Sequence, residues 1–238
     1  YVASASSVEL GEGDPLHYEP GDELPANVLK LPGWVRLAAG VDEAPHGLEL
    51  PADMWIPTPL AVYLERDKGV QLDVAEALVW PEHRRALSNL AGHFKDWSKE
   101  LKADETPAGE WALRMVKTLY TKALGGYLAS TQGLTPPEWH RPDWAALLRA
   151  QAEANMLRAL DRLPDGAVVR AKYADAAFIE FGEAVDLASW DRLDAIQPGR
   201  WKLVGAPLAA DPSFRGLRAT AESWRAAYEA GQAEEVSA

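Results

Sequence analysis

The feature that most constrains this chain is a pair of amphipathic helical patterns near its centre. Between residues 83 and 102, large apolar residues recur at spacings of three and four: Leu87, Leu90, Phe94, Trp97 and Leu101. This spacing places them on one face of a helix. A second helix is predicted over residues 108–129, with a broad buried face made of Trp111, Met115, Val116, Leu119, Tyr120, Leu124 and Leu128.

Strand patterns precede these two helices. Runs of apolar and β-branched residues predict strands at 28–37, 48–56 and 70–80. We expect the first two to pair antiparallel, with Trp34 and Trp55 as packing anchors. Thr58 and Gly69 delimit a predicted helix, Thr58 as its N-cap and Gly69 just past its end. Residues 1–30 are rich in Gly, Pro and acids, which predicts loops, with one strand or short helix within residues 1–10.

A third helix and a β-hairpin follow. Asp143 is the expected N-cap of a helix that runs to about residue 163. Residues 168–173 and 178–181 predict two strands that pair across 174–177, with Asp175 at the tip. The remaining predicted elements are a strand at 201–204, a helix at 217–228 and a disordered acidic tail over 229–238. Helices mixed with antiparallel strands predict an α+β fold, an antiparallel sheet packed by long helices.

Composition excludes several kinds of chemistry. The chain has no cysteine, so disulfides, thiolate zinc sites and cysteine nucleophiles are ruled out. The signatures of P-loop, Rossmann, zincin and serine-hydrolase sites are missing, and no two of the five histidines are spaced i, i+4. No apolar run is long enough for a membrane helix and no signal peptide follows Tyr1, so we expect a cytoplasmic protein without a membrane partner. Because the chain starts at Tyr1 rather than Met, we interpret it as part of something longer.

Charge separates one segment from the rest of the chain. The 24 bases and 36 acids give a net charge of −12, which disfavours broad binding to a polyanion. Residues 83–122 nevertheless hold eight bases and five acids, a surplus of +3. Within them Arg114, Lys117 and Lys122 lie on the second predicted helix and are suited to hold phosphates. A solvated helix face is the alternative interpretation.

The hairpin tip offers a second candidate site. Asp175 would project one carboxylate there, but two-metal phosphoryl transfer needs at least two. The position two residues beyond it is Ala177. A single acid at a hairpin tip is more often a turn residue.

The basic helix and the hairpin together resemble the palm region of family B DNA polymerases. In that family a helix carries Lys-x-x-x-Asn-Ser-x-Tyr-Gly. Lys117 and Gly125 fall on its lysine and glycine, whereas Thr121, Lys122 and Leu124 replace its Asn, Ser and Tyr. The opening residues 1–4 are similar to the end of the family's first palm motif, whose aspartate would precede them.

The family's later hairpin carries Tyr-x-Asp-Thr-Asp. Tyr173 and Asp175 match this motif, but Ala176 and Ala177 replace the Thr and the second Asp. Lys202 ends a Gly-x-Trp-Lys run similar to the strand that follows the hairpin in the family. The resemblance implies that Asp175 is the remaining catalytic carboxylate and a possible Mg²⁺ ligand. It also implies nucleic-acid or nucleotide contacts from Arg114, Lys117, Thr121, Lys122, Gly125, Tyr173 and Lys202.

Short segments at 3–15, 55–59, 140–144 and 150–158 also resemble actinobacterial telomere-associated replication proteins. We therefore divide the chain into a loop-rich region (1–82), a palm-like region (83–228) and the tail (229–238). Losing the second carboxylate should cripple nucleotidyl transfer.

The expected function is thus that of a degenerate, non-catalytic DNA-associated module in replication or telomere maintenance. Its partner would be DNA, as ends or single strands, or a replication protein. Two alternatives stay open. One is an active nucleotidyltransferase completed by an upstream aspartate, and the other is an acidic protein-interaction domain.

Overall fold

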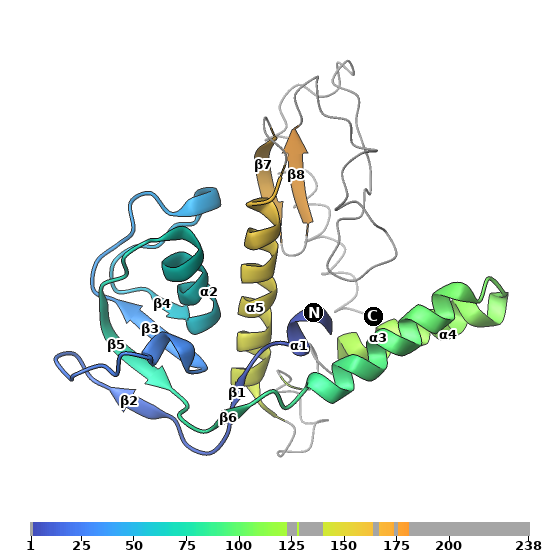
Figure 1. Ribbon diagram of the computed structural model, residues 1–238, viewed down its shortest axis with the longest axis horizontal. Helices are drawn as coiled ribbons and strands as arrows, with labels where there is room; N and C mark the ends of the chain where they lie inside the picture. The colour runs from blue at the N-terminus through green and yellow to red at the C-terminus, as the bar shows by residue number, and fades with distance from the viewer. Residues whose placement is uncertain (1, 123–127, 129–139, 164–166, 174–175, 181–238) are drawn as a thin grey trace, which may run out of the picture. The chain divides into compact units, whose positions relative to one another are not determined.

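The computed structural model describes residues 2–122, 128, 140–163, 167–173 and 176–180 (Figure 1). The chain divides into two units, Tyr1–Asp161 and Arg162–Ala238. The first unit combines helices with antiparallel strands, and the described part of the second holds a β-hairpin. The predicted α+β class is therefore confirmed. The predicted division into 1–82, 83–228 and 229–238 stays a prediction.

A four-stranded antiparallel sheet lies in the first unit, in the order β2-β5-β3-β4. Its strands are β2 (Leu16–Tyr18), β3 (Gly33–Leu37), β4 (Trp55–Pro57) and β5 (Val74–Val79). Burial alternates along β3, as expected for a sheet with one covered face. The covered face consists of Val35, Leu37, Ile56, Ala77 and Val79, all fully buried.

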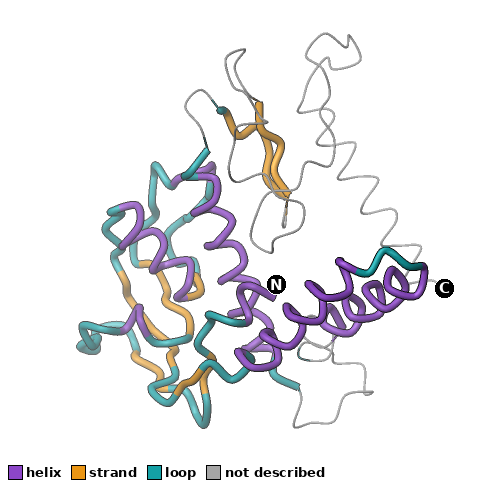
Figure 2. The backbone as a smooth tube through the Cα atoms, turned by 45° about the vertical axis from the view of Figure 1, so that its right-hand side comes forward, coloured by secondary structure: helices purple, strands orange, loops and turns teal. Residues whose placement is uncertain are grey.

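Two helices complete this part of the core. Helix α2 (Thr58–Val62), extended by one π-helical turn η3 (Tyr63–Asp67), packs against β3 and β4. Helix α5 (Pro142–Leu160) packs against α2. In Figures 1 and 2, α2 lies between the sheet and α5. Gly69 follows at a φ of 69°, in the left-handed region, which confirms the predicted end of the helix.

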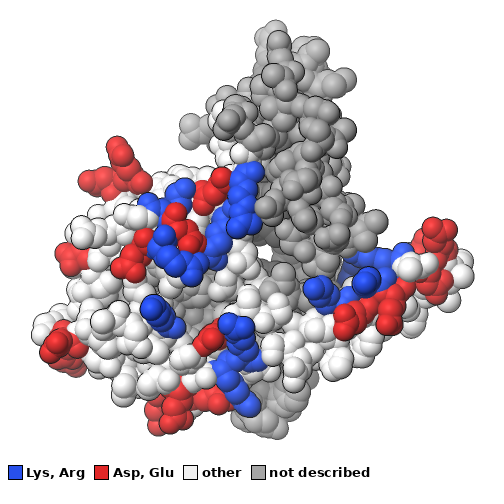
Figure 3. All heavy atoms as spheres, in the orientation of Figure 1, with Lys and Arg blue, Asp and Glu red and all other residues white. Residues whose placement is uncertain are grey.

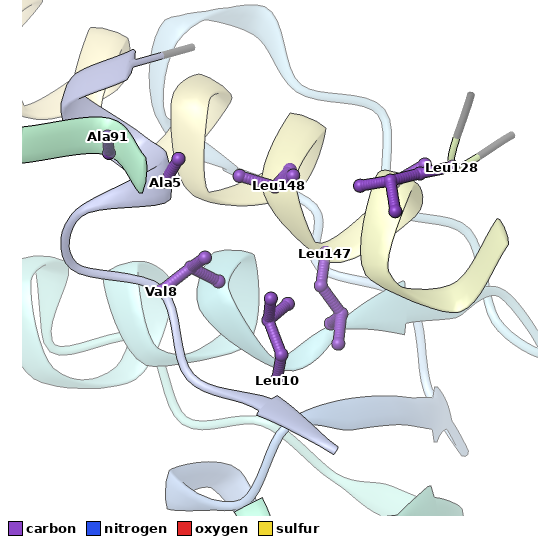
Figure 4. Close-up of a cluster of buried hydrophobic side chains, with 8 residues drawn as sticks. Ala5, Val8, Leu10, Ala91, Leu128, Leu147 and Leu148 are labelled. Carbon is purple, nitrogen blue, oxygen red and sulfur yellow. The ribbon is translucent and has the colours of Figure 1, made fainter. Parts of the chain in front are cut away.

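A second cluster of buried side chains joins the N-terminal segment to α5 (Figure 4). The segment holds helix α1 (Val2–Ala5) and strand β1 (Leu10–Gly11), which pairs with β6 (His83–Arg84). The cluster consists of Ala5, Val8, Leu10, Ala91, Leu128, Ala145, Leu147 and Leu148. Ala5, Val8 and Leu10 therefore contribute to the core, and α1 and β1 confirm the strand or short helix predicted within residues 1–10.

Helices α3 (Ser88–Ala103) and α4 (Pro107–Thr121) run side by side in Figures 1 and 2. The two predicted helices are thus present. The predicted broad buried face of the second is wrong, because Trp111, Met115 and Leu119 are 64%, 42% and 53% exposed. A single neighbouring helix covers only part of so wide an apolar stripe. The predicted continuation to residue 129 lies outside the described residues, except for Leu128, which is buried.

Two predicted details of the strands are wrong: Trp55 is not a packing anchor, and the first strand starts later than residue 28. Trp55 is 39% exposed, because its register partner Arg36 lies on the outer face of β3. Trp34 is a packing anchor as predicted, and its ring packs edge to face against Trp80 with centroids 5.8 Å apart. The strand predicted over 28–37 starts only at Gly33, because residues 28–30 form a 3₁₀ turn (η1, Val28–Lys30).

The two predicted N-caps have other roles. Pro57 is the N-cap of α2, and the buried Thr58 hydroxyl accepts a hydrogen bond from the Gly33 N–H at 3.1 Å. Arg141 is the N-cap of α5, and Asp143 in its first turn accepts hydrogen bonds from the Arg141 guanidinium. The Thr58 side chain thus serves a tertiary contact, and the Asp143 side chain a local contact with the residue that precedes the helix. None of the described helices is long and apolar enough to cross a membrane.

Candidate nucleic-acid interface

Helix α4 begins with a tight connection from α3. Thr106 is its N-cap, and its hydroxyl accepts a hydrogen bond from the Gly109 N–H at 3.1 Å. The Asp104 carboxylate accepts one from the Thr106 N–H at 3.0 Å. A Cβ at Gly109 would lie 2.5 Å from the Asp104 carbonyl oxygen, so a side chain there would displace the connection. This packing fixes how α4 folds back along α3.

Aromatic contacts hold the two helices together. Phe94 of α3 is 5% exposed, and its ring lies 5.7 Å from the Tyr120 ring of α4. Trp97 contacts Phe94 edge to face at 5.8 Å and stacks on His93 at 6.0 Å. The Phe94–Tyr120 contact places the Tyr120 side of α4 toward α3.

The solvent side carries the predicted basic residues. Arg114, Lys117 and Thr121 are exposed and spaced by three and four, so α4 brings them to one face. Lys122, also exposed, lies five residues beyond Lys117 and therefore about 140° further round the helix. The structure thus groups three of the four predicted contacts on this helix and separates Lys122 from them.

Ion pairs reduce the positive surplus of this segment. Arg84 pairs with Glu12 at 2.5 Å, and Arg85 lies 3.6 Å from Glu9. These two bases are therefore offset by acids of the N-terminal segment. Residues 88–122 hold six bases and five acids, a surplus of +1. Figure 3 accordingly shows bases and acids intermixed on α3 and α4.

Arg114 makes only a weak ion pair. Its guanidinium lies 3.8 Å from the Glu110 carboxylate one turn earlier, and both side chains are exposed. An exposed pair of this kind contributes at most about 0.5 kcal/mol. Arg114 therefore stays accessible to an anion.

The second unit contains the predicted hairpin. Strands β7 (Val168–Tyr173) and β8 (Ala176–Glu180) pair antiparallel, with Tyr173 opposite Ala176. The predicted four-residue connection is wrong, because Ala176 and Ala177 belong to β8. Their extended, paired backbone shortens the connection to residues 174 and 175. Ala177, at the place of the family's second carboxylate, lies opposite Lys172 in the register.

Three predicted site residues lie outside the described residues: Gly125, Asp175 and Lys202. The proposed Asp175–Mg²⁺ contact therefore stays a prediction. Within the described ranges, no group of three or more His, Asp or Glu side chains is arranged to bind a metal.

A cluster of charged residues where α5 ends was not predicted from the sequence. Asp161 Oδ1 accepts hydrogen bonds from Lys68 Nζ at 2.8 Å, His46 Nε2 at 2.8 Å and the Tyr63 hydroxyl at 3.3 Å. Burial acts to raise the pKa of Asp161, but the hydrogen bonds from Lys68 and His46 outweigh it, so its pKa lies below the ordinary value. Burial, followed by the Asp161 charge, raises the pKa of Tyr63.

The same cluster contains a second shared carboxylate. Asp67 Oδ2 accepts from Arg158 Nε at 2.5 Å, and Asp67 Oδ1 accepts from Arg66 Nε at 2.8 Å. The bond from Arg158 joins η3 to the last turn of α5, and the bond from Arg66 lies within η3. The partners of Asp161 lie 93 to 115 residues away in sequence, so no local pattern could have revealed them.

Arg141 and Trp144 form a further unpredicted contact. Arg141 Nη2 and Trp144 Nε1 both donate to the Gly11 carbonyl at 2.8 Å, and the guanidinium lies 4.2 Å from the centre of the Trp144 ring. These residues belong to the 140–144 segment on which part of the resemblance depends. Here they lock α5 onto β1. No protein-family model matches the chain, and neither a curated protein nor a solved structure matches it significantly.

Proposed function

We propose that this protein is a non-catalytic, polymerase-like module that associates with DNA in the replication or telomere maintenance of linear DNA. The observation that carries the proposal is the exposed face of α4 with Arg114, Lys117 and Thr121. A guanidinium, an ammonium and a hydroxyl in adjacent turns are suited to contact consecutive phosphates. The modest +1 surplus of α3 and α4 favours a restricted contact rather than broad DNA binding.

The order of elements supports the resemblance to a polymerase palm. Lys117 lies on a helix, and Tyr173 lies on a later β-hairpin, which are the elements that the family's two motifs occupy. Ala177 occupies a paired strand position and offers no oxygen ligand, which supports a non-catalytic role. Asp175 alone cannot supply the carboxylates that a two-metal site needs.

DNA binding is tested by measuring the affinity for single- and double-stranded oligonucleotides across a range of salt concentrations. The double variant Arg114→Glu/Lys117→Glu should bind at least about tenfold more weakly and with a shallower salt dependence, because it loses two phosphate contacts. Lys95→Glu/Lys99→Glu is the matched control, since it makes the same charge change at exposed positions of α3. Equal losses in the two variants would show a general charge effect and reject the assigned face.

The non-catalytic role is tested by primer extension with Mg²⁺ or Mn²⁺. We expect no extension. Extension that Asp175→Ala abolishes would establish the alternative, an active nucleotidyltransferase, even if the DNA-binding prediction holds.

A further inference from the structure

Helix α4 carries a row of large apolar side chains that the fold leaves uncovered. Trp111, Met115 and Leu119, here called the apolar row, are spaced by four residues and therefore follow one side of the helix over about 12 Å. On the neighbouring helix α3, Trp97 is also among the exposed large apolar residues. Isolated exposed apolar residues are ordinary, but an aligned set of this size marks an interaction surface.

The apolar row faces away from Lys117 of the basic face. Lys117 lies two residues from both Met115 and Leu119, and two residues turn a helix by about 200°. The row therefore lies on the side opposite Lys117. A ligand centred on Met115 and Leu119 need not touch Lys117, although Arg114 borders the row three residues after Trp111. The inference does not rest on the proposed function.

Charge around the row specifies its partner. No acid lies between residues 111 and 122, and of the three bases there Lys117 lies on the side opposite the row. Lys122 lies three residues after Leu119, at the end of the row, and makes no ion pair within the described part of the chain. A complementary surface is therefore apolar along its centre and acidic at its edge.

We propose that the apolar row is the docking surface for an acidic amphipathic helix of a partner protein. The partner would present apolar residues at i, i+4 and i+7 to Trp111, Met115 and Leu119, with a carboxylate facing Lys122. The aromatic side chain of Trp111 and the flexible thioether of Met115 suit such an anchor site. A second copy of α4 fits less well, because it would bring the same bases together and its one acid, Glu110, already lies beside Arg114.

The test uses the full chain and a fluorescent synthetic helix of about 20 residues, longer than the ~12–15 that an isolated helix needs. The probe carries leucines at i, i+4 and i+7 and glutamates at the edges of that stripe. A companion probe has lysines in place of the glutamates. Binding is measured by fluorescence anisotropy. The acidic probe should bind about tenfold or more tightly than the basic one.

Matched variants locate the contact. Leu119→Glu should weaken binding of the acidic probe about tenfold or more, whereas Leu16→Glu, the same change at an equally exposed leucine of β2, should leave it unchanged. Lys122→Glu should shift the preference toward the basic probe. Circular dichroism establishes that the variants keep the parent fold.

Three outcomes would overturn the proposal. Equal losses in Leu119→Glu and Leu16→Glu would show that the probe does not use the row. A dimer in sedimentation that Leu119→Glu dissociates would make a second copy the occupant. Weakening of oligonucleotide binding by Leu119→Glu as strong as that by Arg114→Glu/Lys117→Glu would make nucleic acid the occupant. Unchanged DNA binding in Leu119→Glu keeps this proposal distinct from the DNA-binding one.

Discussion

The sheet with α2 and the pair α3–α4 use the same kind of apolar pattern with opposite results. Val35, Leu37 and Ile56 are fully buried because α2 covers their face of the sheet, and α5 in turn packs against α2. On α4, the equally apolar Trp111 and Leu119 stay exposed because α3 covers only one side. Periodicity therefore identifies an apolar face, but the number of neighbouring elements decides whether that face becomes core or surface.

The largest effect that tests this comparison is expected in the core beside α5. Leu147→Ala should lower the free energy of unfolding by about 2–5 kcal/mol, because Leu147 is fully buried and its truncation leaves a cavity. Urea denaturation measures it. A loss as small as that of a surface substitution would show that the cluster around Leu147 does not form.

A close contact on β1 gives the next effect. A Cβ at Gly11 would lie 2.1 Å from Trp80 Cγ, so Gly11→Ala should destabilise the protein by about 1–3 kcal/mol through overpacking. Gly92→Ala in α3 is the matched control. Its Cβ would meet nothing within 4 Å, so the better helix propensity of alanine should stabilise the protein by up to about 1 kcal/mol. The denaturation midpoint should fall in Gly11→Ala and rise in Gly92→Ala. A shift in the same direction in both variants would refute the difference in packing between the two glycines.

Asp161→Asn tests the charged cluster where α5 ends. The change should lower the free energy of unfolding by about 1–2 kcal/mol at pH 7, because Lys68 and His46 lose their shared carboxylate. The folded pKa of Asp161 is depressed, so its contribution is fully present above the unfolded pKa of about 3.9 and is lost as the pH falls through the folded value. The difference in free energy of unfolding between parent and variant, measured by denaturation from pH 7 to pH 3, should therefore narrow only below about pH 4.

Asp53→Asn serves as the control for that experiment. Asp53 pairs with Arg36 at 2.6 Å, but its side chain is 78% exposed, so solvent screens the pair and the change should be small. If the difference in free energy of unfolding between parent and Asp161→Asn stays constant down to pH 3, the Asp161 carboxylate is not ionised in the folded protein as assigned.

The smallest effect is expected on α4. Leu119→Ala should change the free energy of unfolding by no more than about 0.5 kcal/mol, because the side chain is already in solvent. Denaturation under the conditions used for Leu147→Ala measures it. A loss above about 2 kcal/mol would mean that the row is core, and would remove the contrast between the two regions.

Local patterns predicted much of the fold. The spacing of Leu87 and Phe94 gave α3, and the alternation around Val35 gave β3, because both depend on neighbours within a few residues. The exposed side of α4 and the cluster around Asp161 could not be predicted, because they depend on what packs there from distant parts of the chain. At the candidate site, the three-residue spacing was enough to predict that Arg114 and Lys117 lie on the same face of a helix. The ion pair between Arg84 and Glu12, which reduces the positive charge of this segment, could be seen only in the tertiary structure.

The Gly11 carbonyl has a consequence for the order in which the molecule forms. It accepts hydrogen bonds from Arg141 and Trp144, which lie 130 and 133 residues later in the chain. Contacts of such high sequence separation form slowly, because the intervening chain must first be brought together. During synthesis from the N-terminus, β1 leaves the ribosome long before α5 exists. The segment with β1 is therefore secured only after α5 has emerged, and we expect Leu10, which belongs to one buried cluster with Leu147 and Leu148, to stay open to proteases and chaperones until then.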